Sequence, residues 1–321
     1  MVKQRVVIIL AVAAIWVFAI AERYFSPHAV TADPTQRSNN QRSRTETYGA
    51  PVQLGLLQDT AINESSGVVA SRNNPGLFWT HNDSGDGPFI YAFDRQGKSR
   101  GVWRVTGASA RDWEDIAAGP GPQKNQSYLY VGDIGDNGGK RSTIDIYRLV
   151  EPTITPSDTS GTKSRPRATA IAEVIHLRYP DGSHDSETLL VHPVTGDLYL
   201  ITKEFMGNAG VYRARAPLDS QRTLSLSHTG GISIPSLLGG FVTGGDISPD
   251  GRRVAICDYT QGYELVIAEG KPFDEIWKQS VKTLTLGSRK QGEAIAYRLD
   301  GKALLTTSEG VHSPLIEIVR R

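Results

Sequence analysis

Residues 185–204, with the sequence DSETLLVHPVTGDLYLITKE, contain the pattern that predicts the fold class. An acidic start leads into the apolar run Thr188–His192, and a turn containing Gly196 joins it to a second apolar run, Asp197–Thr202. Two short apolar runs joined by a glycine-containing turn are typical of antiparallel strands. The same arrangement recurs along the chain, which predicts an all-β repeat protein.

Five segments share the acidic or small start and the apolar strand that follows it. They are Glu64–Val68, Asp112–Ile116, Asp185–Leu189, Thr243–Ile247 and Gln291–Ile295. Their third residues are separated by 48, 73, 58 and 48 positions, and a four-stranded propeller blade takes about 40 to 50 residues. We therefore predict a β-propeller of five four-stranded blades, with insertions in the second and third repeats.

The fifth repeat offers three strands rather than four. The apolar segment Pro51–Leu57 can supply the missing outer strand and would close the ring, which leaves only short, protected edges. Six blades remain an alternative if the insertion over residues 151–180 contains a degenerate blade. The strands are not separated by amphipathic helices, so the pattern argues against a TIM barrel or a Rossmann fold.

The N-terminal residues 1–21 are expected to direct export. Lys3 and Arg5 precede an apolar run of 16 residues that ends in the small-residue tripeptide AIA, as in a signal peptide. A run this short favours a cleaved signal over a membrane span, which needs about 20 residues, but an uncleaved single-pass anchor stays open. Both predict a periplasmic or extracellular protein. Residues 22–50 are polar and predict a flexible tether, and residues 51–321 predict the propeller domain.

Composition excludes several kinds of partner and site. Of the 321 residues, 39% are hydrophobic, enough for a sizeable core. Lys and Arg total 35 against 34 Asp and Glu, so there is no basic excess for nucleic acid, and we expect no such partner. Cys257 is the only cysteine, which rules out an internal disulfide and a cysteine zinc site. Its apolar neighbours predict a buried, inert thiol.

Candidate catalytic residues gather at one end of the predicted propeller. In each blade the inner strand and its neighbour are antiparallel, so inner-strand starts and second-strand ends share a face. Three repeat starts carry Glu114, Glu187 and Glu293, and His81 lies near the same rim. Three carboxyl groups near one axis raise each other's pKa unless a cation or a proton offsets them. We take these four residues as candidate acids, bases or ligands, although a lone histidine is commonly structural.

Two loops at this rim have the composition of metal sites. They are NDSGDG at residues 82–87 and DIGDNGG at residues 133–139. Carboxylates interleaved with glycine suit Ca²⁺, which prefers carboxylate and carbonyl oxygens. The candidate ligands are Asp83, Asp133, Asp136 and Asn137. Neither loop matches an EF-hand, and ordinary β-turns use the same residues.

Four further residues are candidate contacts for an organic ligand. Lys203 and Arg111 could offset the carboxylates or bind an anion, and His184 lies near the same rim. Trp113 adjoins Glu114 and could stack on a ligand. In contrast, Trp79 and Trp103 fall inside predicted strands and are expected to pack between blades.

Several stretches carry a family resemblance: FWTHNDSGD (78–86), YVGDIGDN (130–137) and QGEAIAYRLDGKALLTTSEG (291–310). They resemble an exported bacterial group of β-propellers of mostly unassigned activity, and more distantly the phytase-like, SMP-30/gluconolactonase and WD40-like propellers. The distant likeness implies Ca²⁺-dependent hydrolysis of phosphoesters or lactones at an acidic channel mouth, onto which Glu114, Glu187, Glu293, Asp133 and Asp136 map loosely. Those families generally have six blades, whereas this chain has five repeats.

Two functional hypotheses follow. The first is a binding module that holds a cation together with a small-molecule or protein ligand on the acidic rim. The second is a Ca²⁺-dependent hydrolase in which a rim Glu serves as base. Carboxylates on adjacent blades also allow a glycosidase. The chain contains no Gly-x-Ser-x-Gly, His-Glu-x-x-His or P-loop motif, so the sequence leaves open whether it is an enzyme.

Overall fold

The computed structural model describes residues 47–236 and 239–321. These belong to one compact unit, Glu46–Arg321. The export segment predicted over residues 1–21 and the tether up to residue 46 lie outside the described residues. None of the helices in the described part of the chain is long and apolar enough to cross a membrane.

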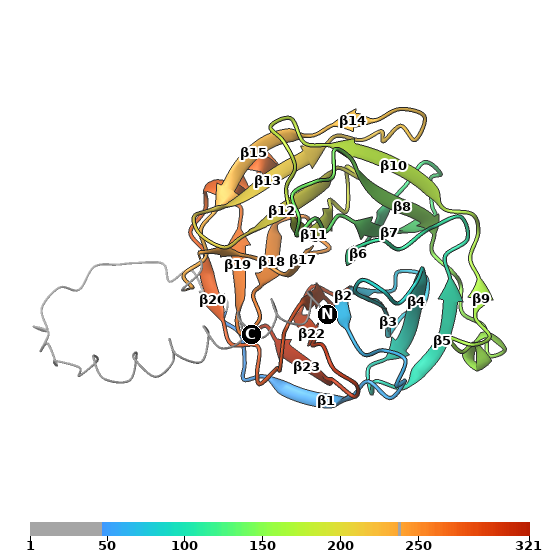
Figure 1. Cartoon of the computed structure of the whole chain (residues 1–321). Helices are drawn as coiled ribbons and strands as arrows, with labels where there is room; N and C mark the ends of the chain where they lie inside the picture. Colours follow the sequence, from blue (N-terminus) through green and yellow to red (C-terminus); the bar gives the residue numbers. More distant parts are fainter. Residues whose placement is uncertain (1–46, 237–238) are drawn as a thin grey trace, which may run out of the picture. The chain divides into compact units, whose positions relative to one another are not determined.

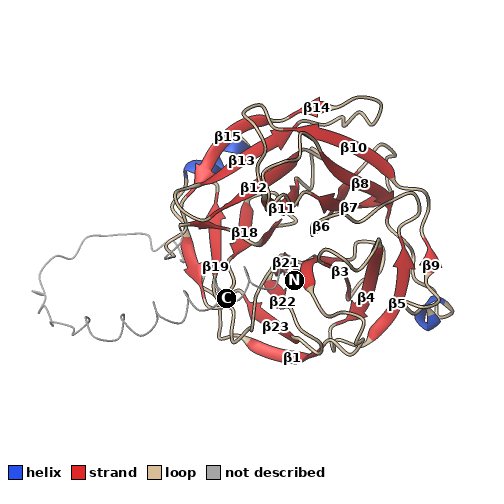
Figure 2. Cartoon of the chain, in the orientation of Figure 1, coloured by secondary structure: helices blue, strands red, loops and turns tan. Residues whose placement is uncertain are grey.

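Five antiparallel sheets stand around a central channel as the blades of a β-propeller (Figures 1 and 2). The prediction of five blades is confirmed. From inner to outer strand, blade 1 contains β2 (Ser65–Ala70), β3 (Leu77–Asn82), β4 (Phe89–Asp94) and β5 (Ser99–Arg104), and blade 2 contains β6 (Trp113–Pro120), β7 (Ser127–Asp133), β8 (Ile144–Val150) and β10 (Glu173–Arg178). Blade 3 contains β11 (Ser186–Val191), β12 (Leu198–Glu204), β13 (Ala209–Ala214) and β15 (Ser227–Ile232), and blade 4 contains β17 (Gly244–Ile247), β18 (Arg253–Cys257), β19 (Gly262–Val266) and β20 (Lys282–Leu284). Blade 5 contains β21 (Ala294–Tyr297), β22 (Ala303–Thr307), β23 (Pro314–Val319) and β1 (Val52–Leu56).

Short elements extend three of the blades. The two insertions form no sixth blade in the described residues. Instead they supply two-residue strands that run parallel beside an outer strand, and a third short strand pairs with β12. These elements are β9 (Arg167–Ala168) beside β5, β14 (Leu224–Ser225) beside β10, β16 (Gly240–Phe241) beside β12, and the 3₁₀ turns η1 (Asp158–Ser160) and η2 (Phe273–Lys278).

The N-terminal strand closes the ring, as the sequence predicts. β1 pairs antiparallel with β23, and the bond from Gly49 N–H to the Val319 carbonyl, 2.8 Å, extends this pairing toward the chain end. The turn at Gly97 fits against β1. Its φ is +75°, and a Cβ there would lie 2.1 Å from the Leu56 carbonyl oxygen, so only glycine allows this close approach.

Apolar side chains fill the spaces between adjacent blades. Trp79, Trp103 and Trp113 lie in one such cluster, and the first two meet edge to face with their ring centroids 5.0 Å apart. The packing role predicted for Trp79 and Trp103 is confirmed, and Cys257 is fully buried as expected. Each inner strand also contacts the next around the ring, and buried carboxylates join two of these pairs. Asp115 accepts the Leu189 N–H (2.9 Å), and Asp246 accepts the Tyr297 N–H (2.8 Å).

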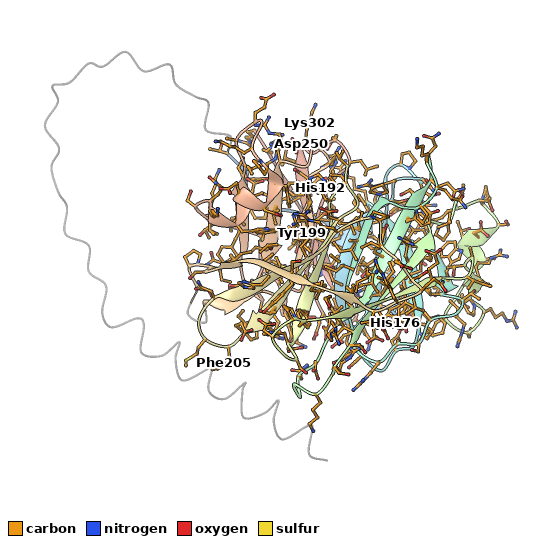
Figure 3. The ribbon with its side chains drawn as sticks, turned by 90° about the horizontal axis from the view of Figure 1, so that it is seen from above. His176, His192, Tyr199, Phe205, Asp250 and Lys302 are labelled. Carbon is orange, nitrogen blue, oxygen red and sulfur yellow. The ribbon has the colours of Figure 1, made fainter. Side chains whose placement is uncertain are left out.

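The two faces of the propeller differ in which strand ends they carry. Figure 3 shows Phe205, which follows β12, on one face, and Asp250 and Lys302, in the turns after the inner strands β17 and β21, on the other. The inner strands therefore all start on the Phe205 face and end on the Asp250 face.

Candidate functional site

Three glutamates converge where the inner strands start. Glu114 is the second residue of β6, Glu187 the second of β11, and Glu293 directly precedes β21. Their side chains are buried, with residue exposures of 4 to 5%. Burial raises the pKa of Glu114 and Glu293 well above the usual value, and in both cases Glu187 is the charge that raises it most. We call these three residues, together with Asp83 and Asp112, the acidic mouth.

A β-bulge places the glutamates of two blades. In β6 the register with β7 shifts between Trp113 and Asp115, so that Glu114 is the extra, unpaired residue. In β11 the same shift leaves Glu187 unpaired, and in β2 it leaves Ser66 unpaired. A bulge re-aims a side chain without ending the strand. The bulge is therefore repeated at equivalent positions of these blades and directs their side chains toward the same end of the propeller.

Lys203 neutralises one of the glutamates. Its ammonium, near the end of β12, forms an ion pair with the Glu187 carboxylate, lies 3.3 Å from the Tyr259 hydroxyl and 4.7 Å from the Phe241 ring centroid. Burial still raises the pKa of Glu187 to about 7, because desolvation outweighs the lowering effect of Lys203. The sequence predicts that Lys203 could offset the carboxylates, and in the structure it forms an ion pair with one of them, Glu187.

Asp83, Asp112 and Glu114 form the tightest carboxylate cluster among the described residues. One oxygen of each lies within 4.8 Å of the other two. Burial, together with the charge of Asp112, raises the pKa of Asp83 to about 6. Gly135 packs directly on the cluster: a Cβ there would lie 2.0 Å from the Glu114 Oε1 atom and 2.7 Å from an Asp112 oxygen. The backbone of the 134–138 loop can cover these carboxylates only because residue 135 is glycine.

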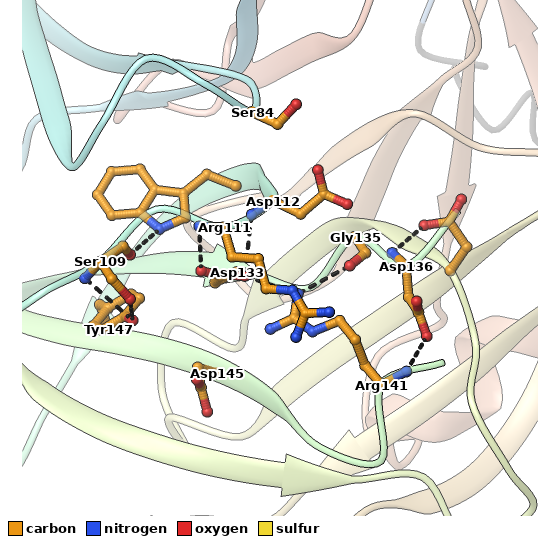
Figure 4. A network of polar contacts seen from close by, with 12 residues as sticks. Ser84, Ser109, Arg111, Asp112, Asp133, Gly135, Asp136, Arg141, Asp145 and Tyr147 are labelled. Atoms are coloured by element: carbon orange, nitrogen blue, oxygen red, sulfur yellow. Dashed lines mark hydrogen bonds and ion pairs between the residues drawn. The ribbon is translucent and has the colours of Figure 1, made fainter. Parts of the chain in front are cut away.

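The loop at residues 133–139 shapes the site through its own hydrogen bonds (Figure 4). Asp133 accepts the Arg111 N–H (2.9 Å) and a guanidinium N–H of Arg141 (2.8 Å), and it is 1% exposed. Asp136 accepts the Arg141 N–H at 2.7 Å, and Asn137 is exposed in the turn. Of the four predicted metal ligands only Asp83 joins the carboxylate cluster. Asp133 and Asp136 instead hold the loop that covers it.

His81 and Trp113 lie inside the blades. The His81 Nδ1 donates to the Asn82 carbonyl (2.8 Å), while its Nε2 is buried with no hydrogen-bond partner among the described residues. Burial lowers the pKa of His81 to about 4, so the ring is neutral at pH 7. Trp113 is 0% exposed and donates its indole N–H to the Ser109 carbonyl at 3.0 Å. Since neither ring reaches the channel, we include neither in the proposed site.

Arg111 and His184 lie at the rim outside the cluster. The Arg111 side chain is exposed, and its backbone N–H bonds to Asp133. His184 lies 3.0 Å from an Asp181 oxygen and packs against Tyr179. Asp112 is not among the ligands that the sequence predicts. Its position two residues before Glu114, at a repeat start, was the signal that could have found it.

These features define an all-β, five-bladed propeller with carboxylates at one channel mouth. No protein-family model and no curated protein matches the chain. Among solved structures it is similar to the crystal structure of RRP9 WD40 repeats, with 11% identity and a TM-score of 0.38, over 80% of this chain and 67% of that chain. The assignment to propellers rests on the five sheets themselves.

Proposed function

We propose that the acidic mouth binds a Ca²⁺ ion through Asp83, Asp112 and Glu114 and presents it to a small-molecule or protein ligand. The observation that carries this proposal is the set of three carboxylate oxygens within 4.8 Å of one another. Hard oxygen donors at this density suit Ca²⁺, which takes six to eight oxygen ligands, some of them from water or from the bound ligand.

The charges around the cluster support a cation there. Lys203 forms its ion pair with Glu187 rather than with Asp83 or Glu114. The pKa values of Asp83 and Glu114 are therefore raised mainly by burial and by neighbouring carboxylates. A divalent cation would remove both the repulsion and the desolvation penalty of these groups. We also propose that the protein works outside the cytoplasm, where the Ca²⁺ concentration is high enough to fill sites of modest affinity.

Stability should respond to Ca²⁺ in a pH-dependent way. Raised carboxyl pKa values mean that the folded state binds more protons than the unfolded state, so without metal these groups weaken stability as pH rises through about 6. Ca²⁺ competes with those protons. We expect 1 mM Ca²⁺ to raise the melting temperature by about 1 to 3 °C at pH 8 and far less at pH 5. An equal rise at both pH values, or with Mg²⁺ in its place, would contradict the proposed site.

A second candidate function is Ca²⁺-dependent hydrolysis, favoured by the state of Glu187. A carboxyl group whose pKa is near 7 can accept a proton at neutral pH, and Glu187 acts electrostatically on Glu114 within the cluster. The test is turnover of a panel of phosphoesters, lactones and aryl glycosides with Ca²⁺. Activity that is lost in Glu187→Gln while Ca²⁺ binding persists supports an enzyme. A panel left untouched leaves the binding module as the function.

A further inference from the structure

A cavity lies at the end of the propeller axis opposite the acidic mouth. Its volume is about 230 Å³, and the last residues of the inner strands line it, with Pro193 completing the ring after β11. The strand ends that it contacts are Ala70, Ala118, Ile247 and Tyr297. Ala118 lies four residues after Glu114 in β6, or about 13 Å along the strand. The cavity therefore opens on the Asp250 face of Figure 3, opposite the acidic mouth.

Arg72 is the one basic residue among the described residues that line this cavity. Apolar side chains such as Val69, Ala70 and Leu299 share the lining with a similar amount of polar surface. The guanidinium makes no hydrogen bond and no ion-pair contact to any residue in the described ranges; only the backbone N–H of Arg72 is bonded. Burial lowers the pKa of Arg72, while the nearby charges of Asp246 and Glu151 act in the opposite direction. A half-buried guanidinium with five unused donors is suited to a carboxylate.

The two carboxylates that act on the charge of Arg72, Asp246 and Glu151, accept their hydrogen bonds from other groups and not from its guanidinium. Glu151, 1% exposed, accepts the Ser71 hydroxyl, the Trp79 indole N–H at 2.9 Å, and the backbone N–H groups of Arg72 and Asn73. It thus fixes the turn that carries Arg72 and leaves the guanidinium available. Asp246 lines the cavity, but its two oxygens accept the N–H groups of Ile247 and Tyr297, each at 2.8 Å.

We propose that this cavity binds a small monocarboxylate with an apolar body, its carboxylate on Arg72 and its hydrocarbon part against the inner-strand ends. The size sets the class of ligand, since a cavity of about 230 Å³ is smaller than a drug-sized pocket. The five blades surround the apolar part, and the single guanidinium fixes the orientation of the acid.

Calorimetric titration with isovalerate tests this proposal, with isovaleramide as the neutral analogue and isoamylamine as the cationic one. We expect isovalerate to bind at least about tenfold more tightly than either analogue. Arg72→Gln should remove this preference, and Arg72→Lys, which keeps the charge but loses the planar fork, should retain part of it. The control is Arg222→Gln, which changes an arginine whose side chain is 74% exposed.

Equal binding of isovalerate and isovaleramide to the unmodified protein would overturn the proposal, as would unchanged isovalerate affinity in folded Arg72→Gln. Circular dichroism and melting temperature establish that each variant is folded. The outcome is separate from that at the acidic mouth. Glu114→Gln should leave isovalerate binding unchanged, and absence of Ca²⁺ binding would overturn the proposed function without bearing on this cavity.

Discussion

Replacing Lys203 with Met is expected to lower the free energy of unfolding by about 3 to 5 kcal/mol at pH 8. Removing one partner of a buried ion pair leaves the other charge without compensation, and the loss is of this size. Here Glu187 would remain beside Glu114 and Glu293 with no cation, and the side chains of Lys203 and Glu187 are only 14% and 7% exposed. Urea unfolding followed by tryptophan fluorescence measures the change.

Lowering the pH should reduce the loss of unfolding free energy in Lys203→Met. The pKa of Glu187 lies above its usual value, so near pH 5 the carboxyl group becomes protonated and the missing ammonium matters less. The double variant Lys203→Met with Glu187→Leu serves as the matched control, because it removes both charges and should recover most of the lost stability. A loss that is the same at pH 5 and pH 8, or that the double variant does not reduce, would contradict the electrostatic account of the acidic mouth.

Trp79→Ala is expected to lower the free energy of unfolding by about 3 to 5 kcal/mol. The side chain is 0% exposed and packs on Trp103 between blades. Its indole N–H also donates to Glu151, the residue that holds the 71–74 turn. Truncation therefore leaves a cavity and takes one donor from a buried carboxylate. Chemical denaturation at pH 7 measures the effect.

Two further variants separate these contributions. Trp79→Phe keeps most of the volume but removes the bond to Glu151, and we expect a loss of about 1 to 3 kcal/mol. Phe205→Ala changes an aromatic residue that is 58% exposed, and should change stability by less than about 0.5 kcal/mol. If Trp79→Phe were as stable as the unmodified protein, the bond to Glu151 would have no part in holding the turn.

The repeat spacing was sufficient to predict the blades. An inner strand with an acidic start, a turn and a second apolar strand recur at nearly blade length, so the five sheets and the closure by β1 followed from local patterns. The same periodicity placed Glu114, Glu187 and Glu293 at equivalent positions. Ring symmetry brings these positions to one end of the propeller, and the bulges in β6 and β11 set the directions of the Glu114 and Glu187 side chains.

The contacts of the residues at the acidic end of the propeller depend on local backbone geometry that the sequence pattern does not reveal. A bulge at the start of β6 turns Trp113 into the core while its neighbour Glu114 reaches the cluster, and simple strand alternation does not reveal which of two adjacent residues does so. The 133–139 loop has the composition of a metal site. Its fold places Arg141 on Asp133, so the carboxylate that looked available is already paired.

Calcium titration by calorimetry measures cation binding at the acidic mouth itself. The metal-free protein at pH 8 should bind one Ca²⁺ with a dissociation constant of about 0.1 to 1 mM, the range of extracellular modules. Glu114→Gln and Asp83→Asn should each weaken binding by at least about tenfold. Glu269→Gln, which alters a glutamate whose side chain is 89% exposed, should leave it unchanged. Absence of binding in the unmodified protein, or equal affinity in Glu114→Gln, would contradict a cation site at the acidic mouth.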